Sequence, residues 1–180
     1  MMTRTALVAA GLPNNFWPYA TRCVCFNHNT DWSDGESPWY KAHQKGEFDG
    51  TRLPFGCLVW FLRSATKASK GEKELRVPKW GARGAPGIFA GYRTRPGCGW
   101  SGRYLVWDLA SFAKLDLSAD ASGKVSAVAS PHETTRVHLP SGEVQFPCKA
   151  RYDFLNNTLE GVQIGLGIRT ADEDEGTSGL

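Results

Sequence analysis

The chain has 180 residues, of which 41% are hydrophobic and 12% aromatic, and its formal net charge is +3. This share of apolar side chains is enough to bury a core, which excludes a chain that is disordered throughout. No apolar run approaches the roughly 20 residues that a membrane-spanning helix needs. The five cysteines are odd in number and scattered, which argues against a disulfide framework and favours a reducing compartment. We therefore expect about one folded domain without a membrane span.

The first 30 residues predict two helices. Residues 5–10 are typical of the end of a helix that Gly11 stops, because glycine readily adopts the left-handed conformation that ends helices. Asn14 or Asn15 is expected to cap a second helix that runs to about His28. An N-terminal helical segment is therefore predicted for residues 1–30.

The second of these helices is predicted to have one apolar face. Trp17, either Ala20 or Thr21, and Val24 recur at helical spacing. This face has no evident partner within the segment, so it either folds onto the rest of the chain or binds another protein. Its candidate protein-interaction residues are Phe16, Trp17 and Val24.

The middle of the chain predicts a small β-barrel over residues 51–118. A polar connector at 31–50, with one helical turn near 39–43, leads into an apolar run long enough for one strand. The strands expected here are residues 53–62, 87–92 and 104–109, with a solvated loop at 64–78 after the first. Glycines between the strands permit the tight turns and corners of a small barrel.

Positive charge is concentrated in this middle region. Between residues 41 and 103 there are thirteen Lys and Arg against four acidic residues, an excess that would attract an anionic partner. Guanidinium groups beside an indole suit phosphate contact and base stacking, so we expect a DNA or RNA surface at Lys79, Arg83, Arg93, Arg95, Trp100 and Arg103. In the competing interpretation the basic loops only confer solubility and Trp100 folds back into the core.

The last third of the chain predicts an extension over residues 119–165 and a tail. Short strands are expected at residues 114–117, 125–128 and 136–139. A Pro-Ser-Gly turn at 140–142 indicates a hairpin with 144–146, and the apolar spacing after it predicts a helix within 146–161. The acidic residues and glycines of 166–180 predict a disordered tail.

The sequence predicts no catalytic residue, no metal site and no cofactor. The Cys23-x-Cys25 pair with His28 invites a zinc interpretation, but the two thiols point to opposite sides of a helix and no second pair follows. The aspartates outside the tail lack the spacing of a metal or phosphate site; they include Asp31, Asp34, Asp49 and Asp108. We therefore expect a protein that is not an enzyme.

Several motifs, taken in order, resemble the integrases of copia-type retrotransposons. Gly11-Leu12-Pro13 with Phe16-Trp17 and Ala20 is similar to the "GLP..FW..A" that opens the last helix of that family's ribonuclease-H-like core. Ser37-Pro38-Trp39 is similar to the family's "TPYE", and Phe55-Gly56-Cys57 with Val59 and Phe61 is similar to its "FGC.V.F". Lys79, Arg83 and residues 87–92 are similar to its "K...R...GIFLGY", and Tyr104, Val106 and Asp108 are similar to its "Y.V.D". The resemblance covers roughly residues 5–112.

The resemblance implies a mainly β fold: a small SH3-like β-barrel with an N-terminal helical segment and short C-terminal strands and a helix. Residues 1–30 would then be the helical end of the family's catalytic core. The family's metal-binding Asp and Glu residues precede the GLP..FW helix, and Met1 to Ala10 contain no acid. We therefore expect the non-catalytic end of an integrase.

Two functions of different class follow. The first is a non-catalytic nucleic-acid-binding module, located in the nucleus or cytoplasm. The alternative is a structural or protein-interaction subunit recruited into a larger assembly through the N-terminal helix, with an organelle as a further location. The basic loops favour the first, and the unpartnered helix face favours the second.

Overall fold

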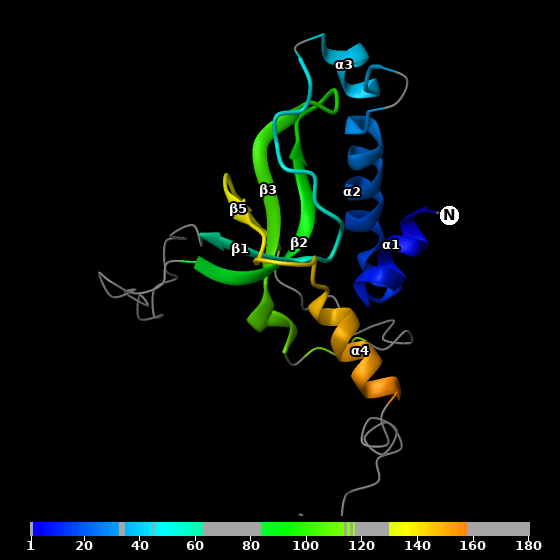
Figure 1. Cartoon of the computed structure of the whole chain (residues 1–180), viewed down its shortest axis with the longest axis vertical. Coiled ribbons are helices and arrows are strands. Elements are labelled where there is room, and N and C mark those ends of the chain that lie inside the picture. Colours follow the sequence, from blue (N-terminus) through cyan, green and yellow to red (C-terminus); the bar gives the residue numbers. More distant parts are fainter. Residues whose placement is uncertain are drawn as a thin grey trace, which may run out of the picture.

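The computed structural model describes residues 2–32, 35–44, 46–62, 84–113 and 130–157, together with Leu115 and Leu117. The helices are α1 (Met2–Ala10), α2 (Trp17–Thr30), α3 (Pro38–His43) and α4 (Pro147–Asn157), with short 3-10 helices η1 (Asn14–Phe16) and η2 (Leu109–Phe112). The strands are β1 (Leu58–Leu62), β2 (Gly84–Thr94), β3 (Trp100–Asp108), β4 (His132–Thr134) and β5 (Val137–His138). Figure 1 shows the sheet with α2 running alongside it and α4 below.

The five strands form one antiparallel sheet in the order β4-β3-β2-β1-β5. β2 is the shared strand, because its first half pairs with β1 and most of its length pairs with β3. The register shifts between Phe89 and Gly91, which leaves Ala90 as an extra residue, and Gly91 has a φ of 132°. Such a bulge bends a strand and increases its twist. β2 can therefore pair with both β1 and β3 in a strongly twisted sheet.

The two edge strands, β4 and β5, follow each other directly in the chain. Only Thr135 and Arg136 separate them, and a link of this length spans at most about 11 Å. The two edges of the sheet therefore curl toward each other, although no ladder joins β4 to β5 among the described strands. Within the described residues the expected barrel is therefore not closed by hydrogen bonds between strands, and with four helices beside the sheet this part of the chain is mixed α and β rather than mainly β.

The second helix does not lack a partner, because α2 packs on the sheet. The ring of Phe26 stacks on Tyr92 with the centroids 4.1 Å apart, and Cys23 lies against Gly91. Just before α2, the ring of Phe16 packs edge-on against Trp107 at 5.2 Å. The helix and the sheet therefore share one hydrophobic core.

Helix α1 ends as predicted at Gly11, whose φ is +65°. The Gly11 N–H donates to the Val8 carbonyl and the Leu12 N–H to the Leu7 carbonyl, each at 3.1 Å. These two bonds form a Schellman motif, which satisfies carbonyls that the helix end leaves without partners. The Gly11 backbone also lies against Lys149 of α4, so the end of α1 and the start of α4 meet at this point.

Other expected elements are matched in part. The turn at 39–43 is α3, whose Ser37 N-cap accepts a hydrogen bond from the Tyr40 N–H at 3.0 Å, and the helix expected within 146–161 is α4. The strand expected at 53–62 begins only at Leu58. Residues 144–146 form no strand, although the Gln145 carbonyl accepts from the Leu58 N–H at 2.8 Å.

The remaining expectations fall wholly or partly outside the described residues. The loop at 64–78, the strand at 125–128 and the acidic tail at 166–180 all lie there. Of the strand expected at 114–117, Leu115 and Leu117 are described and belong to no strand. Each helix in these described ranges is too short or too polar to span a bilayer.

Candidate functional sites

Two arginines face each other on the β2–β3 ladder. Arg93 and Arg103 are direct cross-strand partners and both side chains are exposed. Like charges at such positions repel each other. The carboxylate of Glu133 on β4 lies between them, with Oε1 3.3 Å from Arg93 Nε and Oε2 2.9 Å from Arg103 Nη1. One negative charge thus bridges two positive charges, and the cluster keeps a net positive charge.

Arg95 follows directly after β2, two residues beyond Arg93 in the chain. Its N–H donates to the Gly99 carbonyl at 2.7 Å, which closes the turn, and the residue is exposed. We call Arg93, Arg95 and Arg103 the arginine face. Exposed ion pairs contribute only about 0–1 kcal/mol each, so Glu133 can be displaced from this face at little cost.

Trp100 lies beside Arg103 of the arginine face, and its side chain is held in place. Its indole N–H donates to the Arg103 carbonyl at 3.1 Å, and its ring packs edge-on against Phe48 at 4.9 Å and Tyr104 at 5.4 Å. The side chain is half-buried. It therefore belongs partly to the core, as the competing interpretation expected, and its ring is fixed in position.

The structure brings together four of the six residues predicted to contact nucleic acid: Arg93, Arg95, Trp100 and Arg103. Lys79 and Arg83 lie outside the described residues. Sequence analysis missed Glu133, because it lies 30 residues from Arg103 in the chain. No local pattern signals that a glutamate on β4 joins two arginines of the preceding hairpin.

A cleft of about 380 Å³ opens beside the arginine face, between α2, α3 and the β2–β3 turn. Its apolar wall includes Phe26 and Trp39, and the Trp39 ring lies 4.2 Å from that of His43. Cys25 of α2 and Cys98 of the turn also line it, and both are exposed. We call this space the thiol cleft.

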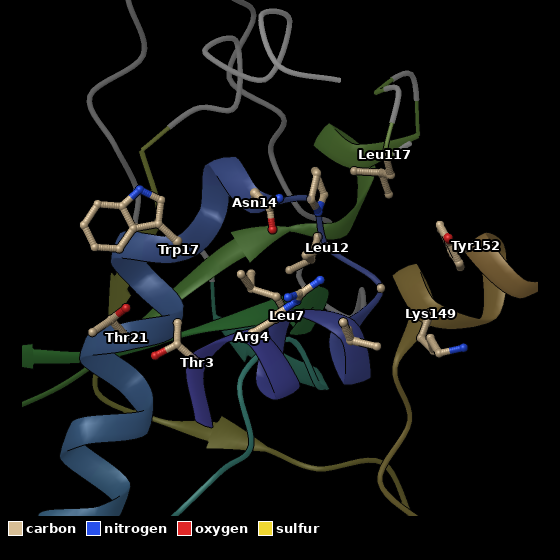
Figure 2. Close-up of a pocket in the computed structure, with 13 residues that line it drawn as sticks. Thr3, Arg4, Leu7, Leu12, Asn14, Trp17, Thr21, Leu117, Lys149 and Tyr152 are labelled. Atoms are coloured by element: carbon tan, nitrogen blue, oxygen red, sulfur yellow. The ribbon is translucent and has the colours of Figure 1, made fainter. Parts of the chain in front are cut away.

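A second hollow, of about 860 Å³, lies among α1, α2 and α4, and we call it the helical groove. Figure 2 shows Trp17 and Thr21 on one side of it, Lys149 and Tyr152 of α4 on the other, and Leu7 between them. The side chain of Trp17 is 60% exposed. The groove is the larger of the two candidate sites.

The predicted protein-interaction residues occupy three different environments. Phe16 is only 3% exposed and is a core residue, so it offers no surface to a partner. Val24 is half-buried and lines a separate shallow pocket beside Arg52. Only Trp17 lies in the helical groove. The buried face of α2 consists instead of Ala20, Cys23, Phe26 and Thr30.

A buried hydrogen-bond network joins α2 to the sheet. The Tyr92 hydroxyl accepts from the Leu53 N–H at 2.9 Å and donates to Asn27 Oδ1 at 2.8 Å. Asn27 Nδ2 in turn donates to the Leu53 carbonyl at 2.9 Å. Burial, together with Cys23 nearby, raises the pKa of Tyr92 above its ordinary value. The hydroxyl therefore stays protonated and has a structural role.

The cysteines divide into two exposed and three buried thiols. Burial raises the pKa of Cys57 and of Cys148 to about 12, and it also raises the pKa of Cys23. Because the thiolate is the reactive form, we expect a maleimide at about pH 8 to label Cys25 and Cys98 rapidly and the other three slowly. Mass spectrometry of the native protein measures this, with denatured protein as the control. A third label acquired at the same rate would contradict the described packing.

Two of the isolated aspartates, Asp31 and Asp108, have structural partners. Asp31 pairs with Arg52 at 2.6 Å, and Asp108 accepts a hydrogen bond from the Ala110 N–H at the start of η2. Asp34 lies outside the described residues. Within the described part of the chain, no group of three or more His, Cys, Asp or Glu side chains could hold a metal ion.

Comparison with known proteins finds no matching family model, no matching curated protein and no matching solved structure. The function must therefore be inferred from the arginine face, the thiol cleft and the helical groove.

Proposed function

We propose that this chain is a non-catalytic nucleic-acid-binding module whose arginine face contacts the phosphate backbone. The observation that carries the proposal is the direct cross-strand pairing of Arg93 with Arg103, with a single carboxylate to compensate them. Guanidinium groups bind phosphate oxygens in a bidentate geometry. A phosphate placed over this hairpin would neutralise the repulsion that Glu133 relieves only in part.

The fold and the sequence motifs support the same proposal. In the observed strand order β1 lies between β2 and β5, and β4 leads directly into β5. We propose that this is an open form of the SH3-like barrel that the resemblance to copia-type integrases implies. On this view the chain derives from the region after an integrase catalytic core and acts on nucleic acid in the nucleus or cytoplasm.

The proposal predicts binding that weakens steeply with salt. Each phosphate contact releases counterions and adds about −0.9 to the slope of log affinity against log salt. Two or three arginine contacts should therefore give a slope between about −2 and −3. Fluorescence anisotropy with labelled DNA and RNA oligonucleotides, between about 50 and 200 mM salt, measures it. No binding at the lowest salt, or a slope near zero, would refute the proposal.

Removing the competing carboxylate should strengthen binding. Glu133→Gln frees both Arg93 and Arg103, and we expect the affinity to rise several-fold and the salt slope to steepen by about 1. Glu143→Gln, at an exposed position between β5 and α4, makes the same change in net charge and serves as the control. Equal gains in both variants would mean that net charge, and not this face, controls binding.

The helical groove supports a second candidate function, that of a protein-interaction subunit. The charged side chains among its lining residues are Arg4 and Lys149, both basic, and Trp17 is exposed beside them. The fitting partner is a segment that combines apolar and acidic side chains. A native pull-down with nuclease separates the two functions, because a nuclease-resistant partner that Trp17→Ala releases would favour this candidate and partners lost to nuclease would favour the first.

A further inference from the structure

We infer that the thiol cleft holds one unpaired base of the bound strand, so that single-stranded nucleic acid is the preferred ligand. This inference rests on the proposed nucleic-acid function and adds the class of ligand. The first observation that supports it is the location of the cleft, which shares the β2–β3 turn with the arginine face. Figure 1 shows that turn and α3 at the same end of the molecule.

The chain order places the cleft next to a phosphate contact. Thr94, Gly97 and Cys98 line the cleft, and Arg95 lies between them in sequence. A phosphate held by Arg95 would therefore bring the neighbouring nucleotide to the mouth of the cleft. In an intact duplex that base is paired and stacked, and removing it from the stack costs a few kcal/mol, a cost that a single strand largely avoids.

The walls of the cleft suit a flat aromatic ligand. Phe26 and Trp39 form its apolar side, with His43 against the Trp39 ring. A volume of about 380 Å³ corresponds to roughly thirteen water molecules at about 30 Å³ each, which is enough room for a purine base. Stacking on aromatic side chains is tolerant of sequence, because every base presents a π-face.

The polar groups of the cleft fit a nucleotide better than a cationic ligand. Arg22 of α2 lies in the lining, and none of the residues that line the cleft is acidic. The side-chain amide of Asn29, also in the lining, can both donate to and accept from a base edge.

The two exposed thiols provide a direct test, because Cys25 and Cys98 both line the cleft. The probes are an oligothymidylate strand and a duplex of the same length, each added to the full chain at equal fractional saturation. We expect the single strand to slow maleimide labelling of both thiols by about tenfold or more and the duplex to change it little. Equal protection by both probes would overturn the inference.

Two variants separate the cleft from the arginine face. Ala42→Trp adds a ring to the cleft from the exposed side of α3, and it should lower single-strand affinity about tenfold while sparing duplex affinity. Tyr40→Trp, an exposed neighbour on α3 that does not line the cleft, should change neither affinity. The Ala42 variant avoids removing Trp39, whose ring also packs on Phe26.

The outcomes distinguish this inference from the function on which it rests. If neither probe binds, the proposed function fails and the inference fails with it. If both probes bind in a salt-dependent way but Ala42→Trp leaves the single-strand affinity unchanged, only the inference is overturned. Thiol protection by the single strand, lost in Ala42→Trp, supports both.

Discussion

Replacing Gly87 by alanine is expected to lower the free energy of unfolding by about 3 kcal/mol. A Cβ atom at this position would lie 2.4 Å from Val106 Cγ1, 2.7 Å from the Trp107 carbonyl oxygen and 2.8 Å from a ring carbon of Phe61. The carbonyl belongs to the neighbouring strand, so relieving the contact requires the β2–β3 ladder to move. Urea unfolding followed by circular dichroism measures the loss.

Gly84, at the start of the same strand, supplies the matched control. A Cβ atom added at Gly84 would lie 3.7 Å from the Trp60 ring, which is an ordinary van der Waals distance. Gly84→Ala should therefore change stability by no more than about 0.5 kcal/mol. Equal stability of the two variants would mean that Val106, Trp107 and Phe61 do not crowd Gly87 as closely as described.

Reversing two charges on the arginine face is expected to weaken nucleic-acid binding about a hundredfold at moderate salt. Arg93→Glu with Arg95→Glu removes two phosphate contacts and adds two repulsive charges, so the magnitude of the salt slope should fall by about 2. Both side chains are exposed, so the fold should persist. The measurement is anisotropy across a salt series, with thermal unfolding to verify folding.

A charge-matched variant on the other candidate site controls for net charge. Arg4→Glu with Lys149→Glu reverses the charge of two basic side chains that line the helical groove. If the arginine face is the binding surface, this variant should weaken binding only a few-fold through the overall charge. Equal losses in the two double variants would rule out a localised surface at the β2–β3 hairpin.

The elements that sequence predicted well are those with strong local signals. Gly11 ends α1 because glycine adopts a positive φ at low cost, and the turn at α3 begins with a Ser37 cap followed by Pro38. β2 and β3 combine apolar and aromatic runs with a Pro- and Gly-containing turn. In each case the residues that determine the element are neighbours in the chain.

The buried face of α2 could not be predicted in the same way, because polar residues contribute to it. Apolar spacing predicted a face that begins at Trp17, whereas the helix buries Cys23 and Thr30 and half-buries Asn27. The Thr30 hydroxyl donates to the Phe26 carbonyl, and the Asn27 amide donates to the Leu53 carbonyl. Polar groups with such partners can be buried at modest cost. A search for apolar periodicity leaves these residues out and therefore places the buried face of the helix at the wrong angle around its axis.

Of the two edge strands, the strand expected at 136–139 is confirmed as β5, whereas β4 and the carboxylate of the arginine face escaped prediction. β4 has only three residues, which is too short for an alternating pattern to emerge. Because β4 was not predicted, no pattern in the sequence placed Glu133 beside Arg93 and Arg103. The charge excess was visible from composition, but its partial compensation depends on strand pairing.

The most direct test of the central claim is a heteronuclear NMR titration of the full chain with a short single-stranded oligonucleotide. The account predicts shift changes at Arg93, Arg95, Trp100 and Arg103, continuing into Trp39 and His43 around the thiol cleft. The amides of α1 and the indole of Trp17 should stay unchanged. Changes confined to the helical groove, or no changes at low salt, would contradict the account and leave the groove as the principal binding surface.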